Sequence, residues 1–184
     1  MELQPIKTER LLLRPFTLEI CKELLANEFT TIEKLGLKCG KNWPDQDIID
    51  TLPKIAKNLS YFKYPSGYES WMIIKADTYE IIGDIGFKGY KYIDDSCDLG
   101  YGIIEGERKK GYAAEAAIAL IQWAFGNKSL KCITATCSLD NEGSARLLQK
   151  LQFKELERCE EFIYWILERR DYEQSYYFTD LTLF

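Results

Sequence analysis

The sequence predicts a single α+β domain built on a mixed sheet, and three observations carry that prediction. The chain has 184 residues, which suffices for one domain of ordinary size with a substantial core. Segments with the two-residue period of strands alternate with segments that have the three- and four-residue period of amphipathic helices. Their order along the chain is β, α, α, β-β-β, α, β, α, β-β, with no internal repeat and no linker.

The first half of the chain is predicted to hold one strand, two helices and a hairpin. Thr17 is a plausible N-cap for the first helix, and Pro53 near the middle of the second predicts a kink or an interruption. The expected elements are a strand at 10–15, a helix at 17–27, a short helical turn and loop within 29–43, a helix from 44 to about 59, and strands at 70–75 and 79–89.

The second half is organised around a central strand and the helix that follows it. The remaining elements are expected at 132–137 (strand), 141–150 (helix), 153–157 (strand) and 162–167 (strand). We expect the domain to span residues 1–170 and the aromatic tail at 171–184 to pack on the domain or on a partner, because exposed aromatic runs are costly.

The central strand has two different faces. Leu99, Tyr101 and Ile103 alternate with glycines at 100 and 102, which leave room for another backbone or a ligand. After Gly111 the period changes, and residues 112–125 present one apolar helical stripe.

A basic turn, residues 108–111, connects this strand to this helix. Arg108, Lys109 and Lys110 precede Gly111, where the first free N–H groups of the helix point outward. Unpaired donors and the positive end of the helix dipole coincide there, which makes an anion site. Three cations oppose that dipole at about 0.3–1 kcal/mol each, so the pattern favours a phosphate ligand over the alternative, a solvated basic turn.

Composition excludes several classes of protein. The net charge of −5 argues against a general nucleic-acid binder and is compatible with an amine-bearing partner. No apolar run is long enough to span a membrane, and the N-terminus lacks signal-peptide character, so we expect a cytoplasmic protein. The chain has no histidine, and its six cysteines form no CxxC pair. We therefore expect no metal site, no His-dependent triad and reduced thiols.

Two motifs in register resemble the GNAT superfamily of acyl-CoA N-acyltransferases. The first is Arg108-x-x-Gly111-x-Ala113 between the strand and the helix, which is similar to the family's pyrophosphate-binding motif. The second runs from Asn141 through Ser144 to residue 153 and is similar to the family's N-x-x-S-x-x-x-L-x-K-x-G-F helix. Segments at 10–14 and 43–45 resemble the RimJ/RimL-like branch, which acetylates ribosomal-protein N-termini. The resemblance implies a mixed, mostly antiparallel central sheet flanked by helices on both faces.

The same resemblance implies acetyl-CoA as co-substrate and assigns residues to it. Backbone N–H groups of the turn would hold the pyrophosphate, two strand residues would pair with the pantetheine arm, and Asn141 would hydrogen-bond it; helix N-capping is the alternative role for Asn141. The implied cofactor-binding residues are Ile103, Ile104, Arg108, Lys109, Lys110, Gly111, Tyr112, Ala113 and Asn141.

The implied reaction is direct attack of a neutral amine on the thioester in a ternary complex. Without histidine, a carboxylate is the natural general base. Asp98 on the central strand is the first choice and Asp84 the second, with a salt bridge or strand-edge solubility as the alternative role for both. Ser144 is the candidate to protonate the leaving thiolate, and Tyr164 or a tail tyrosine is another candidate acid.

Two departures from the family pattern affect fine positioning. Gln152 stands where the family has a glycine, so the turn after that helix needs another solution or carries a cost. Ala114 stands where a small hydroxyl residue is common, which removes one phosphate contact.

Two other functions stay open at this point. The chain could be a catalytically silent acyl-CoA-binding or regulatory module, or a nucleotide- or phosphate-binding interaction protein. The acceptor of an active enzyme could be a protein N-terminus or a small-molecule amine, and the tail could build a homodimer contact.

Overall fold

The computed structural model describes residues 3–61 and 64–175 and confirms the α+β prediction. The strands form a mixed sheet in which most pairs are antiparallel. The chain divides into two compact units, the first made of Met1–Gly86 with Tyr101–Ala119 and the second of Phe87–Gly100 with Leu120–Phe184. The long strands β5 and β6 and the helix α4 each contribute residues to both units.

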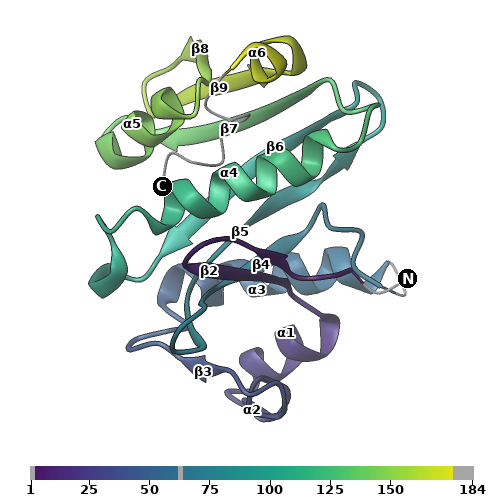
Figure 1. Ribbon diagram of the computed structural model, residues 1–184, viewed down its shortest axis with the longest axis vertical. Coiled ribbons are helices and arrows are strands. Elements are labelled where there is room, and N and C mark those ends of the chain that lie inside the picture. Colours follow the sequence, from purple (N-terminus) through teal and green to yellow (C-terminus); the bar gives the residue numbers. More distant parts are fainter. Residues whose placement is uncertain (1–2, 62–63, 176–184) are drawn as a thin grey trace. The chain divides into compact units, whose positions relative to one another are not determined.

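The first unit contains the N-terminal strands and helices (Figure 1). Its strands follow the order β1-β2-β4-β5, with antiparallel pairs, and short β3 pairs with β5 in parallel. The strands are β1 (Ile6–Lys7), β2 (Leu11–Pro15), β3 (Lys38–Cys39), β4 (Ser70–Lys75) and the first part of β5 (Glu80–Lys91). The sequence patterns missed β1 and β3, because two residues are too few to show a period.

Three helices of this unit begin near the predicted positions: α1 (Leu18–Leu25), α2 (Thr30–Lys34) and α3 (Gln46–Ser60). Thr17 caps α1, as predicted, by accepting a hydrogen bond from the backbone N–H of Ile20. Of the kink or interruption predicted at Pro53, the interruption is wrong, because α3 runs through Pro53. An interior proline costs about 3 kcal/mol, and the buried stripe of α3 on both sides of it (Ile48, Leu52, Ile55 and Leu59) offsets that cost.

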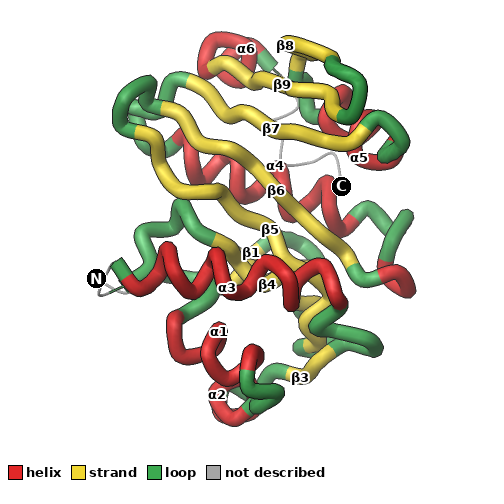
Figure 2. The backbone as a smooth tube through the Cα atoms, turned by 180° about the vertical axis from the view of Figure 1, so that it is seen from behind, coloured by secondary structure: helices red, strands yellow, loops and turns green. Residues whose placement is uncertain are grey.

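The second unit holds the C-terminal strands and helices (Figure 2). The start of β6 pairs in parallel with β7, which pairs antiparallel with β9, and β9 pairs antiparallel with β8. The elements are the first part of β6 (Ser96–Ile103), the last part of α4 (Tyr112–Phe125), and all of β7 (Cys132–Ser138), α5 (Glu142–Lys150), β8 (Lys154–Arg158), β9 (Phe162–Glu168) and α6 (Arg169–Gln174).

The start of the predicted aromatic tail packs on this unit. The ring of Tyr172 stacks on that of Phe125 with 4.4 Å between centroids. Arg169 donates to the carbonyl oxygens of Phe125 and Leu130, at 3.2 Å and 2.8 Å, and so satisfies one carbonyl in the last turn of α4 and one that follows it. The other tail aromatics, from Tyr176 to Phe184, lie outside the described residues, and the domain and tail boundaries remain a prediction.

Gln152 adopts the left-handed conformation, and it stands at the position where the family pattern has glycine. Its φ is +65°, and the N–H of Phe153 donates to the carbonyl of Leu148 in the turn that ends α5. The cost anticipated from the sequence is therefore present.

We expect Gln152→Gly to raise the free energy of unfolding by about 0.5–1 kcal/mol, since relief of left-handed strain exceeds the added entropy of the unfolded chain. Urea denaturation measures the change. Gln152→Ala is the control, because alanine keeps the strain and should bring no gain. A glycine variant no more stable than wild type would contradict this account.

Candidate active site

The basic turn lies in the first unit between a 3₁₀ turn and α4. The strand β6 ends at Ile103, residues Glu105–Glu107 form the 3₁₀ turn, and α4 begins at Tyr112. Lys109 and Gly111 both adopt left-handed conformations, with φ of +62° and +86°. Alternating handedness of this kind turns successive N–H groups toward one side, as in anion-binding backbone nests.

The N–H groups of this turn are available to a ligand. Within the described part of the chain, the backbone N–H groups from Lys109 to Ala114 donate no hydrogen bond, and Glu115 is the first to donate, to the carbonyl of Gly111 at 3.1 Å. An α-helix alone leaves four such donors. The run from Lys109 to Ala114 extends that set into the turn, so the segment fits a pyrophosphate group.

The cations of the turn are only partly free. The guanidinium of Arg108 donates through Nε to the carbonyl of Ile103 at 2.8 Å, and its backbone N–H donates to Glu105. Lys110 pairs with Glu107, with 2.9 Å between Nζ and Oε2. The series of free N–H groups therefore begins one residue later than the sequence suggested, at Lys109.

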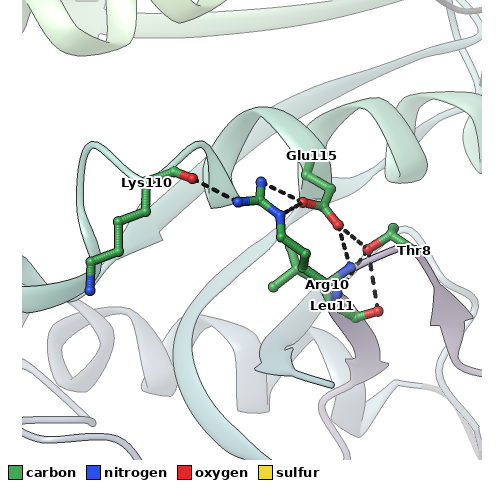
Figure 3. Close-up of polar contacts among 5 residues, drawn as sticks. All are labelled: Thr8, Arg10, Leu11, Lys110 and Glu115. Atoms are coloured by element: carbon green, nitrogen blue, oxygen red, sulfur yellow. Dashed lines mark hydrogen bonds and ion pairs between the residues drawn. The ribbon is translucent and has the colours of Figure 1, made fainter. Parts of the chain in front are cut away.

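A buried carboxylate anchors the turn (Figure 3). The side chain of Glu115, which is 4% exposed, pairs with the guanidinium of Arg10, with 2.7 Å between Nη2 and Oε2. The same carboxylate accepts hydrogen bonds from the backbone N–H of Arg10 at 2.8 Å and from the hydroxyl of Thr8 at 2.6 Å. These contacts fasten the start of α4 to the residues that precede β2.

Arg10 also contacts the turn itself. Its Nη1 donates to the carbonyl of Lys110 at 3.0 Å, and its guanidinium lies 4.9 Å from the ring centroid of Tyr112. Sequence reasoning missed this role for Arg10 and Glu115. The available signal was a lone glutamate in the first turn of an otherwise uncharged helix.

The end of β6 lies very close to β5. A Cβ placed on Gly83 would lie 2.1 Å from the carbonyl oxygen of Gly102, so only glycine fits there. The N–H of Ile104 donates to the carbonyl of Ile82 at 3.0 Å, and the carbonyl of Ile104 accepts from Glu107. Pairing of Ile103 and Ile104 with pantetheine stays a prediction. Each carbonyl oxygen of these two residues has a second lone pair that could accept a hydrogen bond from pantetheine.

Asp98 lies in the second unit, where both carboxylate oxygens have partners. Oδ2 pairs with Nζ of Lys88 at 2.5 Å, and Oδ1 accepts from the hydroxyl of Thr134 at 3.2 Å. Thr134 is directly opposite Asp98 in the parallel pair of β6 and β7. Its role as general base stays a prediction, and these contacts also fit the alternative of a structural ion pair.

Asn141 caps α5 in the second unit. Its Oδ1 accepts from the backbone N–H of Ser144 at 3.0 Å, so the capping role anticipated for this residue is confirmed. The side chain of Asn141 is exposed and that of Ser144 is half-buried. Their roles toward pantetheine and the leaving thiolate remain predictions.

Asp84, the second choice for the general base, lies in a pocket of the first unit. The pocket is lined by Asp45 and Asp47 at the start of α3 and by Trp43 and Arg108. Desolvation raises the pKa of Asp84 to about 7, and the negative charges of Asp45 and Asp47 add to the effect.

The protein-family model of the GNAT acetyltransferase domain matches residues 10–154 of this chain. This range includes the basic turn and Asn141, which caps α5. The chain belongs to this family. A curated relative, the N-acetyltransferase YjdG of Bacillus subtilis, whose function is uncharacterised, is 32% identical over 161 residues, covering 88% of this chain and 96% of YjdG. The ribosomal-protein-serine acetyltransferase of Escherichia coli is 29% identical over 129 residues, covering 68% of this chain and 69% of that enzyme.

Solved GNAT structures share this fold. RimL, a ribosomal L7/L12 α-N-protein acetyltransferase solved with coenzyme A, has a TM-score of 0.64 at 16% identity and covers 91% of this chain and 99% of its own. The ribosomal-protein-S5-alanine acetyltransferase of Vibrio fischeri has a TM-score of 0.65 at 16% identity, with coverage of 92% and 98%. At 16% identity these two structures show that the fold is shared. The Escherichia coli relative supports the RimJ/RimL-like branch.

This GNAT protein is an acetyl-CoA-dependent acyltransferase, as its family and its relatives' names indicate. Among the described residues, no group of three or more His, Cys, Asp or Glu side chains is arranged to hold a metal ion. In the same part of the chain, no helix is long and apolar enough to cross a bilayer.

Proposed function

We propose that this enzyme transfers an acetyl group from acetyl-CoA to a primary amine by direct attack in a ternary complex. The observation that carries the proposal is the series of backbone N–H groups from Lys109 to Ala114, at the N-terminus of α4, that donate to no group in the described part of the chain. Such donors favour a pyrophosphate, and the left-handed Lys109 and Gly111 orient them before any ligand arrives.

The residues at the cofactor side have distinct proposed roles. Backbone donors of Lys109, Lys110, Gly111, Tyr112 and Ala113 hold the pyrophosphate, while Arg108 supports the turn from the carbonyl of Ile103. Ile103, Ile104 and Asn141 position the pantetheine arm. Holding the amine and the thioester in line supplies most of the rate acceleration, because groups held in line within one molecule react with very high effective molarities.

Proton transfer needs an acceptor for the amine proton and a donor for the thiolate. Ser144 is the proposed donor. Asp98 and Asp84 are the two proposed acceptors, and they differ in setting: Asp98 is bound by Lys88 and Thr134, whereas Asp84 faces other carboxylates.

The acceptor of the acetyl group is a protein N-terminus or a small-molecule amine. The Escherichia coli relative is named for a ribosomal protein, whereas the fold is shared with a chimera of the Vibrio cholerae spermidine N-acetyltransferase SpeG (TM-score 0.66, 13% identity, 91% of this chain and 100% of that one). A cytoplasmic location and a homodimer contact through the tail are part of the same proposal. The alternative is a silent acyl-CoA-binding module, which would bind acetyl-CoA without amine-dependent thiol release.

A thermal-shift titration with acetyl-CoA tests the cofactor site. We expect acetyl-CoA and CoA to stabilise the protein by about 2.7 kcal/mol at a hundredfold excess over Kd, because both bind the folded state alone. ADP and NAD are the controls for general phosphate binding and should stabilise far less. Equal stabilisation by all four ligands would support a general phosphate-binding protein. If neither acetyl-CoA nor CoA stabilised the protein, the proposal would be contradicted.

A further inference from the structure

The basic turn has a carboxylate of the chain beside it. Glu107 is the last residue of the 3₁₀ turn before Arg108, and its Oε2 lies 2.9 Å from Nζ of Lys110. The side chain of Glu107 is 18% exposed and that of Lys110 is 50% exposed. Among the described residues, Glu107 is the one partner of the Lys110 ammonium, and the ammonium of Lys109 has none. The turn proposed for a diphosphate therefore holds one of its cations on an internal anion.

A second lysine lies within reach of the same carboxylate. Lys75, at the end of β4, has its Nζ 3.5 Å from Oε1 of Glu107 and 2.5 Å from Oε2 of Glu80. The hydrogen bond with Glu80 raises the pKa of Lys75 above its usual value, and the charge of Glu107 acts in the same direction. Lys75 would therefore remain a charged neighbour of Glu107 if Lys110 moved away.

The backbone of Lys110 is fixed independently of its side chain. Arg10 donates to the carbonyl of Lys110 at 3.0 Å. The residue after Arg10, Leu11 on β2, is paired with Lys75 on β4, so one point of the sheet contacts the turn and the carboxylate before it. The ammonium of Lys110 ends a long, half-exposed and flexible side chain. It is able to change its partner while the backbone of the turn stays in place.

A diphosphate would compete with Glu107 for this lysine. On the N–H groups from Lys109 to Ala114, it would bring more negative charge to the turn than one carboxylate carries. Its phosphate oxygens would accept strong, charge-assisted hydrogen bonds from an ammonium group. An ion pair between Lys110 and the ligand would replace the one with Glu107, so this lysine adds less to the affinity than an unpaired lysine would.

We infer that Glu107 is an internal competitor of the diphosphate of CoA: it pairs with Lys110 in the free enzyme, yields this lysine to a phosphate oxygen when CoA binds, and takes it back as CoA leaves. This inference rests on the proposed function, in which the basic turn binds the diphosphate. Lys75 keeps the carboxylate paired while CoA is bound. Glu107 thereby lowers the affinity for CoA and makes its dissociation faster, which suits an enzyme that must release CoA after every transfer.

Glu107→Gln should tighten the binding of acetyl-CoA. Glutamine keeps the size of the side chain and an acceptor oxygen, but it removes the charge that holds Lys110. We expect Kd to fall about fivefold, which corresponds to about 1 kcal/mol and is the upper range for a solvent-exposed ion pair. Isothermal titration calorimetry measures Kd. Stopped-flow displacement of CoA should show that most of the gain is slower dissociation.

Glu105→Gln is the matched control. Glu105 begins the same 3₁₀ turn, is exposed, and forms no ion pair or side-chain hydrogen bond within the described chain. The substitution changes the net charge of the turn by the same amount without releasing a lysine. We expect it to change Kd by less than about twofold, because exposed charges are screened by water and salt.

A double-mutant cycle with Lys110→Gln separates the release of the lysine from the general effect of the negative charge. Lys110→Gln alone should weaken the binding of acetyl-CoA, since the ligand loses one cation. In that background Glu107→Gln has no lysine to release, and its gain should shrink from about fivefold to less than about twofold. Additive effects in the cycle would contradict the exchange, because Glu107 would then act on the ligand through its charge alone.

A crystal structure of the wild-type enzyme with CoA tests the exchange without any substitution. We expect Nζ of Lys110 to lie within hydrogen-bond distance of a phosphate oxygen and away from Glu107, with Lys75 still beside the carboxylate. A complex in which Lys110 remains on Glu107 would overturn the inference.

Two binding results would overturn it as well. Weaker binding of acetyl-CoA by a folded Glu107→Gln protein would show that the carboxylate supports the turn instead of competing with the ligand. Equal effects of Glu107→Gln and Glu105→Gln would leave Lys110 no part in the difference. Failure of the proposed function itself is distinguishable, because the wild type would then bind no acetyl-CoA in the same titration.

Discussion

Gly111→Val should weaken acetyl-CoA binding at least about a hundredfold, or about 2.7 kcal/mol. Gly111 has φ of +86°, a conformation that β-branched residues avoid, and a Cβ there would lie 3.2 Å from Nη2 of Arg10. The turn must rearrange to accept valine. Rearrangement would redirect the N–H groups from Lys109 to Ala114 that we propose for the pyrophosphate.

Isothermal titration calorimetry with acetyl-CoA measures this loss. Gly106→Ala is the matched control, since Gly106 lies in the neighbouring 3₁₀ turn and a Cβ there meets no atom within 4 Å. It should bind acetyl-CoA as tightly as the wild type. If Gly111→Val bound acetyl-CoA normally while remaining folded, the turn would not be the pyrophosphate site.

Glu115→Ala should lower the free energy of unfolding by about 2–3 kcal/mol. Removal of this carboxylate leaves the hydroxyl of Thr8 and the N–H of Arg10 without their acceptor, and a part-buried donor that loses its partner is costly. Loss of one partner of a fully buried ion pair costs about 3–5 kcal/mol. The guanidinium of Arg10 is 40% exposed, so water recovers part of that loss and the estimate is reduced accordingly.

The same variant should also weaken acetyl-CoA binding, because Arg10 contacts the carbonyl of Lys110 in the basic turn. Chemical denaturation and calorimetry measure the two effects. Glu142→Ala is the control: Glu142 also lies in a first helical turn and pairs with Arg146, but both side chains are more than 70% exposed. It should change neither property appreciably. A stable Glu115→Ala protein would show that the buried contact does not anchor α4.

Most helices and strands could be predicted, because they are long enough for the period of their apolar residues to be recognised in the sequence. The helix α4 and the strand β6 have clear apolar stripes, and Thr17 and Asn141 cap helices as their residue types suggest. The short strand β3 could not be found, because it exists only through its parallel pairing with β5. Its two residues carry no pattern of their own.

One part of the candidate site could likewise be predicted from the sequence, and the other part could not. The turn from Arg108 to Gly111 is local, so its composition predicted an anion site. The pocket of Trp43, Asp45 and Asp84 joins residues about forty positions apart, and no spacing rule connects them. Asp98 was chosen for its place on the central strand. Its partner Lys88 comes from a neighbouring strand that only the pairing of strands brings near.

Initial-rate kinetics of thiol release, with acetyl-CoA and a primary amine that the enzyme acetylates both varied, test the central claim most directly. Direct transfer in a ternary complex predicts release that depends on both substrates, with intersecting lines in double-reciprocal plots and an N-acetylated product identified by mass spectrometry. Parallel lines would indicate a covalent acetyl-enzyme instead. Thiol release that ignores the amine, or no release from a protein that binds acetyl-CoA, would contradict direct acetyl transfer.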